Sequence, residues 1–223
     1  MPTIFRGDLQ RPRGGALAWA DSLLADHAIL RLAWSNFGVV VPGRLYRSNH
    51  PTPGRLETQT RRYGLRTVIN LRGRRANGSD ALSRHAAARL GLRSLDAPLS
   101  CLRPPSREEL LMLAEVLLAG PEPMLVHCKS GADRAGFAAA VFLILDGRDM
   151  AQARRQLSLR FGHWRRSRAG VLDAVLEAFA RDAGTGGDFL GWLRDAYDPA
   201  AIGRDFHGGH FADFITHRLV ARE

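Results

Sequence analysis

Two kinds of residue are scarce in this chain of 223 residues: cysteine occurs twice and lysine once. Two cysteines, Cys101 and Cys128, cannot build the disulfide network of a small secreted domain, so we expect a reduced compartment, the cytoplasm. The most apolar run, 135–145, is too short to span a bilayer. The first residues lack the charged-then-apolar organisation of a signal peptide. These features together exclude a disulfide scaffold and a membrane-spanning protein.

Positive charge is abundant, and arginine supplies nearly all of it, with a formal net charge of +10. This balance favours an acidic partner, such as a phosphoester, an anionic membrane surface or nucleic acid. A GC-rich genome alone would also produce an excess of arginine. The position of the single lysine, Lys129, is more informative, because it lies within the segment that best indicates a function.

That segment, residues 127–136, reads His-Cys-Lys-Ser-Gly-Ala-Asp-Arg-Ala-Gly and places Cys128 and Arg134 six positions apart. The apolar run 123–126 before it predicts a buried strand, and the run 135–145 after it predicts a buried helix. A loop from a strand to a helix directs backbone N–H groups and the positive end of the helix dipole at one point. A dianionic phosphoryl group suits that point, with Cys128 as its nucleophile and Arg134 forked across two of its oxygens.

The chemistry explains why these residue types are needed. A thiol attacks only as the thiolate, which a helix N-terminus, a nearby arginine and converging N–H donors all favour. The same donors then hold the equatorial oxygens of the phosphoryl group during its transfer. The pattern therefore predicts phosphoester hydrolysis through a phosphocysteine, with no metal and no other cofactor.

The run His127–Arg134 resembles the signature loop of the cysteine-dependent protein tyrosine phosphatase superfamily, in its dual-specificity branch. Upstream, Gly-Arg-Leu-Tyr-Arg-Ser-Asn-His-Pro at 43–51 and Gly-Leu-Arg-Thr-Val-Ile-Asn-Leu-Arg at 64–72 resemble the opening strands of atypical bacterial, plant and fungal members. The likeness covers about residues 38–180. It implies a three-layer α/β fold, whose central sheet is mixed, largely parallel and flanked by helices. It also implies the phosphate-binding residues, which are Lys129, Ser130, Gly131, Ala132 and Asp133.

The resemblance further implies a general acid that protonates the leaving oxygen. Asp96 lies 32 positions before Cys128, which is the separation that the family leads one to expect. A carboxylic acid close to the cysteine can give the leaving group its proton and later take one from water. Asp133 is the alternative acid, as in myotubularin-type lipid phosphatases. One departure from the family is Ala135, where a serine or threonine commonly helps the thiolate to leave the phosphoenzyme.

Strands and helices alternate along the chain, which indicates a sheet with parallel pairs covered by helices. We expect strands near 38–47, 66–71, 92–95 and 123–126, and helices near 56–63, 80–90, 106–118 and 135–145. Ser106 and Glu109 form a capping box for the third helix. The predicted organisation is a helical N-terminal extension at 1–37, a catalytic domain at 38–182 and a packed C-terminal extension at 183–223.

Two further segments bear on the partner. Residues 16–34 suggest an amphipathic helix, which either packs on its own domain or lies on a membrane surface through Trp19 and Trp34. Arginines after the signature helix either face solvent on a helix or contact extra negative charge on the substrate. The candidates for such contacts are Arg160, Arg165, Arg166 and Arg168.

The expected function is a phosphomonoesterase that acts on phosphotyrosine or phosphoserine proteins, or on a polyanion such as an inositol phosphate or phospholipid headgroup. The basic segment favours a polyanionic or lipid-linked substrate, for example phosphatidylglycerophosphate or lipid A phosphate, and peripheral contact with the inner membrane face. Nucleic acid is not expected as a partner. Two alternatives remain, a weakly active phosphate-binding module, which Ala135 permits, and a sulfurtransferase or arsenate reductase that uses a loop cysteine.

Overall fold

The computed structural model describes residue 5, residue 9 and residues 14–24, 34–184 and 187–206. The chain forms two compact units. The first contains Met1–Asp96 and Pro121–Ser130, and the second contains Ala97–Gly120 and Gly131–Glu223. The described strands all lie in the first unit, and the second is helical. The predicted signature loop runs from one unit into the other.

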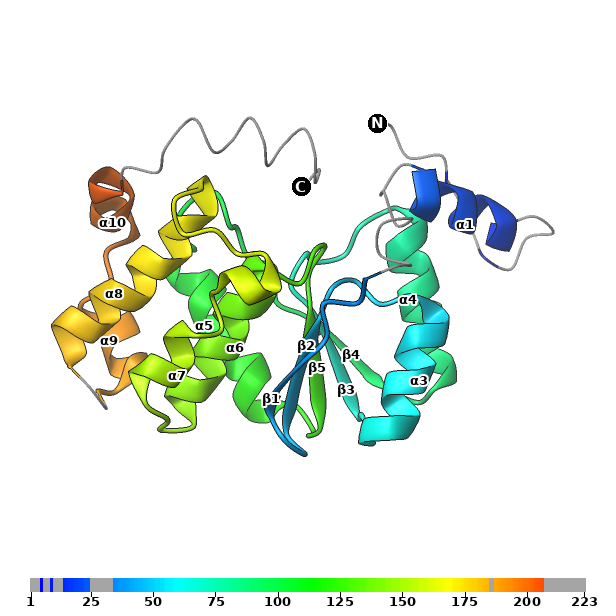
Figure 1. Cartoon of the computed structure of the whole chain (residues 1–223), viewed down its shortest axis with the longest axis horizontal. Helices are drawn as coiled ribbons and strands as arrows, with labels where there is room; N and C mark the ends of the chain where they lie inside the picture. Colours follow the sequence, from blue (N-terminus) through cyan, green and yellow to red (C-terminus); the bar gives the residue numbers. More distant parts are fainter. Residues whose placement is uncertain (1–4, 6–8, 10–13, 25–33, 185–186, 207–223) are drawn as a thin grey trace. The chain divides into compact units, whose positions relative to one another are not determined.

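A five-stranded sheet organises the first unit (Figure 1). Its strands are β1 (Gly38–Val41), β2 (Leu45–Ser48), β3 (Thr67–Asn70), β4 (Arg93–Asp96) and β5 (Met124–His127). Their order across the sheet is β1-β2-β5-β3-β4, which places β5 at the centre. β1 and β2 are antiparallel, and the other neighbours are parallel. The predicted α/β class and the mixed, largely parallel sheet are confirmed.

The single strand predicted near 38–47 is wrong, because this segment is a hairpin of β1 and β2. Pro42 and Gly43 interrupt the strand, and Gly43 has a φ of +74°, a conformation that glycine adopts without steric cost. The amide of Arg44 donates a hydrogen bond of 3.1 Å to the carbonyl of Val41 and closes the turn. The Pro-Gly pair is a turn signal that the sequence already carries.

Helices α3 (Pro53–Tyr63) and α4 (Gly78–Arg89) cover one face of the sheet (Figure 1). Their apolar side chains, including Leu56 and Ala86, form a core with Val68 of β3 and Leu125 of β5. Tyr46 and Tyr63 extend this core, with ring centroids 4.6 Å apart. The loop after β5 therefore starts from a strand that is buried along its whole length.

The N-terminal helix α1 (Gly14–Leu24) packs on α4. The fully buried carboxylate of Asp21 accepts hydrogen bonds from the amides of Phe5 (3.2 Å) and Gly78 (2.6 Å). A β-carbon on Gly78 would lie 2.0 Å from the carbonyl oxygen of Ala18, so this close approach requires glycine. The start of the predicted amphipathic helix thus packs on its own unit, while residues 25–33 lie outside the described part.

The second unit consists of helices around α6 (Asp133–Leu145), whose residues are buried from Asp133 to Leu143. The others are α5 (Arg107–Ala119), α7 (Met150–Arg154), α8 (Val171–Ala183), α9 (Phe189–Asp195) and α10 (Pro199–Asp205), with short 3-10 turns at Leu159–Phe161 and Arg168–Gly170. The predicted capping box at the start of α5 is confirmed: the hydroxyl of Ser106 and the carboxylate of Glu109 each accept the other residue's amide. None of the helices in the described part is long and apolar enough to cross a membrane.

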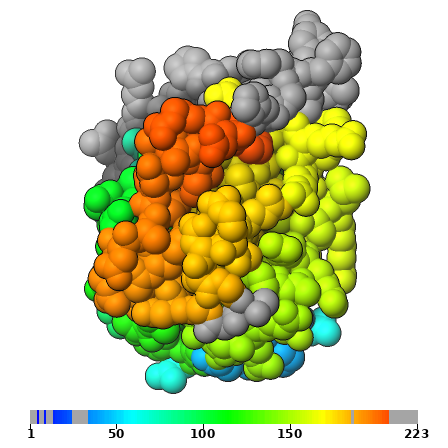
Figure 2. All heavy atoms as spheres, turned by 90° about the vertical axis from the view of Figure 1, so that its left-hand side faces the viewer, coloured from blue at the N-terminus to red at the C-terminus, as the bar shows by residue number. Residues whose placement is uncertain are grey.

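The C-terminal helices pack on α8, as Figure 2 shows for one face of this unit. Phe179 of α8 contacts Phe189 and Trp192 of α9, with ring centroids 5.1 and 5.3 Å away. Tyr197 is almost fully buried and donates a 2.6 Å hydrogen bond to the carbonyl of Pro105. The aromatic residues Phe189, Trp192 and Tyr197 of the predicted C-terminal extension are therefore buried within this unit, and residues 207–223 lie outside the described part.

A buried histidine connects α6 to α8. His163 is 1% exposed, and its Nδ1 lies 2.8 Å from Asp133 Oδ1 while its Nε2 lies 2.7 Å from Asp173 Oδ2. Burial opposes a charge on the imidazole, but hydrogen bonds and attraction to the two carboxylates outweigh it and raise the pKa of His163 to about 9. The imidazolium is therefore the form that the fold stabilises at neutral pH.

We predict that this bridge makes stability depend on pH. The folded pKa of His163 exceeds the unfolded value, so its stabilisation is full below about pH 6.5 and is lost as pH rises through about 9. A rise from 6.5 to about 9 corresponds to about 3 kcal/mol at most. Urea unfolding should show the wild type more stable than His163→Gln at pH 6, with the difference shrinking by about 2–3 kcal/mol at pH 10. A difference that stays constant across this range contradicts the prediction.

Candidate active site

The candidate site begins at the carboxyl edge of the sheet. The register places Ser48, His127, Asn70 and Asp96 in one row across β2, β5, β3 and β4. Parallel strands lie about 4.8 Å apart, so the backbone of Asp96 stands about 10 Å from that of His127. Ligands of α/β proteins bind beyond the carboxyl ends of parallel strands. Asp96 and the residue before Cys128 therefore share the edge where such a site is expected.

Hydrogen bonds from three neighbouring segments fix the first half of the loop. The carbonyl of His127 accepts from the amide of Leu71 at 2.9 Å, and the carbonyl of Lys129 accepts from the amide of His50 at 3.2 Å. The side chain of Asn36 donates to the carbonyl of Ser130 at 2.9 Å.

These bonds also orient the amides of the loop. The C=O and N–H of a trans peptide point in opposite directions. The N–H groups of Cys128, Ser130 and Gly131 therefore point away from the segments that hold the preceding carbonyls. Backbone N–H groups presented by a loop are a common means of binding anions in proteins.

The second half of the loop leads into α6. Gly131 has a φ of +75°, which glycine adopts easily and which turns the chain into the helix. The N-cap residue is Ala132, whose side chain cannot cap the first amides of α6. The positive end of the helix dipole is thus presented at the residues immediately before Arg134. Ala135 is fully buried in the first turn and supplies no hydroxyl group.

Asp96, the predicted acid, forms an ion pair with Arg84. Arg84 Nη2 donates to Asp96 Oδ1 at 2.8 Å, and Arg84 Nε donates to Asp80 Oδ2 at the same distance. Burial opposes the charge of Arg84, but the hydrogen bonds to Asp96 and Asp80 outweigh this effect and raise the pKa of its guanidinium. The Asp96 side chain is one-third exposed. Its carboxylate is thus both paired and accessible to solvent.

Asp133, the alternative acid, lies in a different environment. It is 4% exposed, and its Oδ1 accepts a hydrogen bond from His163, which in turn contacts Asp173. A buried carboxylate beside an imidazolium is held in its ionised form.

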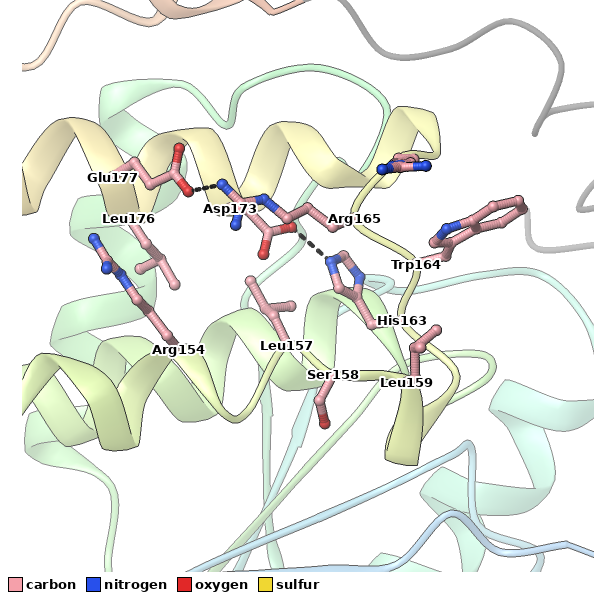
Figure 3. Close-up of a pocket in the computed structure, with 11 residues that line it drawn as sticks. Arg154, Leu157, Ser158, Leu159, His163, Trp164, Arg165, Asp173, Leu176 and Glu177 are labelled. Carbon is pink, nitrogen blue, oxygen red and sulfur yellow. Dashed lines mark hydrogen bonds and ion pairs between the residues drawn. The ribbon is translucent and has the colours of Figure 1, made fainter.

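A pocket of about 350 Å³ opens beside His163 in the second unit (Figure 3). Leu157, Leu176, Leu159 and Trp164 contribute apolar surface to it. Its charged lining residues are Arg154, Arg165, Arg166, Asp173 and Glu177.

Two of the four arginines predicted to contact the substrate line this pocket. Arg165 and Arg166 line it, although Arg165 forms an ion pair with Glu177. The guanidinium of Arg160 lies 5.5 Å from the ring centroid of Phe161, and Arg168 begins a 3-10 turn. Residues 155–167, between α7 and this turn, form turns, bends and one other 3-10 segment. The alternative interpretation, that these arginines face solvent on a helix, is therefore wrong.

The sequence analysis did not identify Arg84 as the partner of Asp96, or His163 as the partner of Asp133. Arg84 also pairs with Asp80, and this pair has the i, i+4 spacing of helical ion pairs, so it could have been found from the sequence. The bond between His163 and Asp133 joins residues 30 positions apart, and no local pattern indicates it.

Known proteins share this architecture. A family model described as "DSP-PTPase phosphatase fused to NAD+ Kinase" matches residues 44–169. The crystal structure of TpbA from P. aeruginosa is similar, with 25% sequence identity over 72% of this chain and 89% of TpbA, and a TM-score of 0.53. No curated protein matches the sequence.

Two further solved structures share the fold at lower identity. A cysteine-to-serine variant of TpbA in complex with pTyr is 23% identical over 73% of this chain and 94% of that one, with a TM-score of 0.52. The core catalytic domain of the PP-IP phosphatase SIW14 from S. cerevisiae, in complex with citrate, is 20% identical over 66% and 87%, with a TM-score of 0.53. Because the family model covers more than half of the chain and includes the signature loop, the chain belongs to the DSP-PTPase phosphatases and is a cysteine-dependent phosphatase.

Proposed function

We propose that this phosphatase uses Cys128 as its nucleophile, Arg134 and the loop amides as its phosphate-binding groups, and Asp96 as its general acid. The observation that carries the proposal is the loop itself, anchored through its carbonyls and continued by the N-terminus of α6. Membership of the phosphatase family favours turnover over a module that only binds phosphate.

The reaction proceeds in two displacements at phosphorus. The thiolate of Cys128 attacks phosphorus, the bond to the ester oxygen breaks, and that oxygen takes a proton from Asp96. Water then attacks the phosphocysteine and gives its proton to the Asp96 carboxylate. The S–P bond breaks, which releases inorganic phosphate and restores the thiolate. Arg134 and the amides hold the equatorial oxygens in both steps.

Asp96 suits the role of acid better than Asp133 does. Ion pairs exposed to solvent contribute about 0–1 kcal/mol. The Arg84–Asp96 pair is partly exposed, so we expect substrate binding to displace Arg84 at modest cost. Once displaced, the carboxyl group can exchange protons with solvent and substrate. Asp133 is buried and held by His163, so a proton on it would disrupt the bridge to α8.

The substrate that the geometry favours is a phosphomonoester with a second negative charge and an apolar portion. Arg154 and Arg166 line the pocket and have no ion-pair partner within the described residues, so their charges are available to a ligand. Leucine side chains and Trp164 would contact the apolar portion (Figure 3). Charge-assisted hydrogen bonds to arginine suit a remote phosphate or carboxylate. An acidic phospholipid headgroup and an amphiphilic phosphoprotein segment both carry this chemistry.

The first prediction concerns the nucleophile. Cys128→Ser should reduce hydrolysis of p-nitrophenyl phosphate to below about 1% of wild type, because a serine hydroxyl is not ionised here. The variant should still bind inorganic phosphate, since Arg134 and the loop amides remain. Steady-state kinetics and calorimetric titration measure the two quantities. Activity above that level would remove Cys128 from its assigned role.

The second prediction concerns the acid. Asp96→Asn should lower kcat by about 10²–10⁴ for an alkyl phosphate, whose leaving oxygen needs a proton. The loss should be much smaller for p-nitrophenyl phosphate, whose leaving group is already a weak base. Asp133→Asn is the matched control and should show no such dependence on the leaving group. The opposite pattern would assign the acid role to Asp133.

The third prediction concerns substrate charge. The double variant Arg154→Ala/Arg166→Ala should lower kcat/KM for a phosphorylated amphiphile with a second anionic group by about 100-fold, at tenfold for each contact of roughly 1.5 kcal/mol. The same variant should change kcat/KM for p-nitrophenyl phosphate by less than about threefold. The loss should shrink at high salt.

Arg155→Ala provides the matched control for the third prediction. Arg155 is exposed, adjoins Arg154 in the chain and does not line the pocket. It should leave both substrates unaffected. The double variant is assayed on two substrates separately: an acidic phosphorylated lipid in vesicles and a soluble phosphopeptide. The substrate with the larger loss of kcat/KM is the one whose second charge these arginines bind. Equal losses on p-nitrophenyl phosphate would show that these arginines support the fold instead.

A further inference from the structure

Segment 150–172 of the second unit carries charge of one sign. It contains no aspartate and no glutamate. Its arginines are all exposed, and Glu177 of α8 forms an ion pair with Arg165. A concentration of exposed positive charge attracts an acidic partner. The arginines of the segment are Arg154, Arg155, Arg160, Arg165, Arg166 and Arg168.

Two large apolar side chains protrude from the same segment. Leu159 is 76% exposed and Trp164 is 40% exposed. Both line the pocket of Figure 3, which shows them at the end that lies away from Glu177. Arg160 follows Leu159 in the chain, and Arg166 lies two positions after Trp164. Exposed apolar surface that is rimmed by charged residues is typical of interaction sites.

Hydrogen-bonded turns hold these two side chains at the surface. The carbonyl of Leu159 accepts a hydrogen bond of 2.9 Å from the amide of Gly162. The carbonyl of Trp164 accepts from both the amide (3.0 Å) and the hydroxyl (2.7 Å) of Ser167. His163, which precedes Trp164, is buried between α6 and α8. The backbone under the exposed side chains is therefore already ordered, and a partner that binds them loses little affinity to ordering it.

We propose that Leu159, Arg160, Trp164 and Arg166 form a docking surface for a membrane that contains anionic phospholipids. The headgroups of such a membrane attract arginine, and the boundary just beneath them accommodates leucine and tryptophan. As a route to a lipid substrate the docking surface rests on the proposed function, but docking itself requires no turnover.

The apolar side chains favour a membrane over other acidic partners. Nucleic acid offers phosphates to arginine and bases to Trp164, but the aliphatic Leu159 has no corresponding contact in either mode of binding. An acidic protein would need carboxylates opposite Arg160 and Arg166 and a recess for each apolar side chain. A membrane presents anionic headgroups and an apolar boundary everywhere on its surface, so it fits all four side chains without a matched shape.

Vesicle co-sedimentation tests the docking surface. The probes are vesicles of phosphatidylcholine alone and of an equal mixture with phosphatidylglycerol, a phosphodiester that offers no phosphomonoester to hydrolyse. The full chain should bind the mixed vesicles at least about tenfold more tightly, and this preference should shrink at high salt. Leu159→Ala/Trp164→Ala should lower the partition coefficient at least about tenfold. Arg160→Gln should lower it about fivefold.

Met112→Ala/Leu118→Ala is the matched control. These side chains of α5 are 44% and 59% exposed, but the exposed Glu115 lies between them in the chain and an anionic surface repels it. The control should bind the mixed vesicles as the wild type does. Thermal unfolding establishes that each variant is folded. If Leu159→Ala/Trp164→Ala is not, Leu159→Ala alone takes its place and should still weaken vesicle binding.

Three results would overturn the proposal. The first is equal or undetectable binding of the two kinds of vesicle by the wild type. The second is weakened binding in Arg160→Gln with none lost in Leu159→Ala/Trp164→Ala, which would identify a general anion surface for nucleic acid or an acidic protein. The third is a loss confined to Trp19→Ala, which would place the membrane contact on α1. Failure of the proposed function would look different, because Cys128→Ser would remain active while vesicle binding was unchanged.

Discussion

The anchoring of the carbonyls of His127, Lys129 and Ser130 is the constraint on which the site depends. Leu71, His50 and Asn36 each bind one carbonyl in the stretch 127–130, and each planar peptide directs its own N–H group away from the segment that holds its carbonyl. The central position of β5 makes this possible, because only a strand with neighbours on both sides has flanking segments that reach the loop from two directions. The residue types of the loop must be compatible with this backbone conformation. Gly131 supplies the one turn that a residue with a β-carbon would resist.

Two acidic residues near an anion-binding loop raise an electrostatic difficulty, and the chain resolves it differently in each case. Asp96 is paired with Arg84 at a partly exposed position, where the pair is weak and can exchange. Asp133 is paired with His163 in the interior, where removal of one partner leaves a buried charge and is costly. The first arrangement suits a group that takes up and releases protons in each cycle. The second suits a fixed charge that must not change during catalysis.

Local patterns in the sequence predicted much of the fold and the centre of the site. The capping box at Ser106 and the strand, loop and helix around Cys128 are encoded within a few residues, so spacing alone indicates them. The hairpin at Gly43 has a local turn signal in Pro42 and Gly43, but the apolar residues on both sides of this signal give the pattern of one longer strand. The His163 bridge could not be predicted, since it depends on how the chain returns to α6 after α7.

The irregular segment after α7 shows why charge alone was an incomplete guide to the substrate. Its arginines look equivalent in the sequence, but the structure separates them by their partners. Arg165 is paired with Glu177, and the guanidinium of Arg160 lies over Phe161. Arg166, together with Arg154 at the end of α7, lines a pocket that also has leucine walls, and neither has an ion-pair partner within the described residues. A charge that is already neutralised adds little to binding a further anion, whereas an unpaired guanidinium beside an apolar surface favours a ligand that carries both features. Under the proposed function, the number of arginines therefore matters less to specificity than Arg154 and Arg166, which have no ion-pair partner within the described residues.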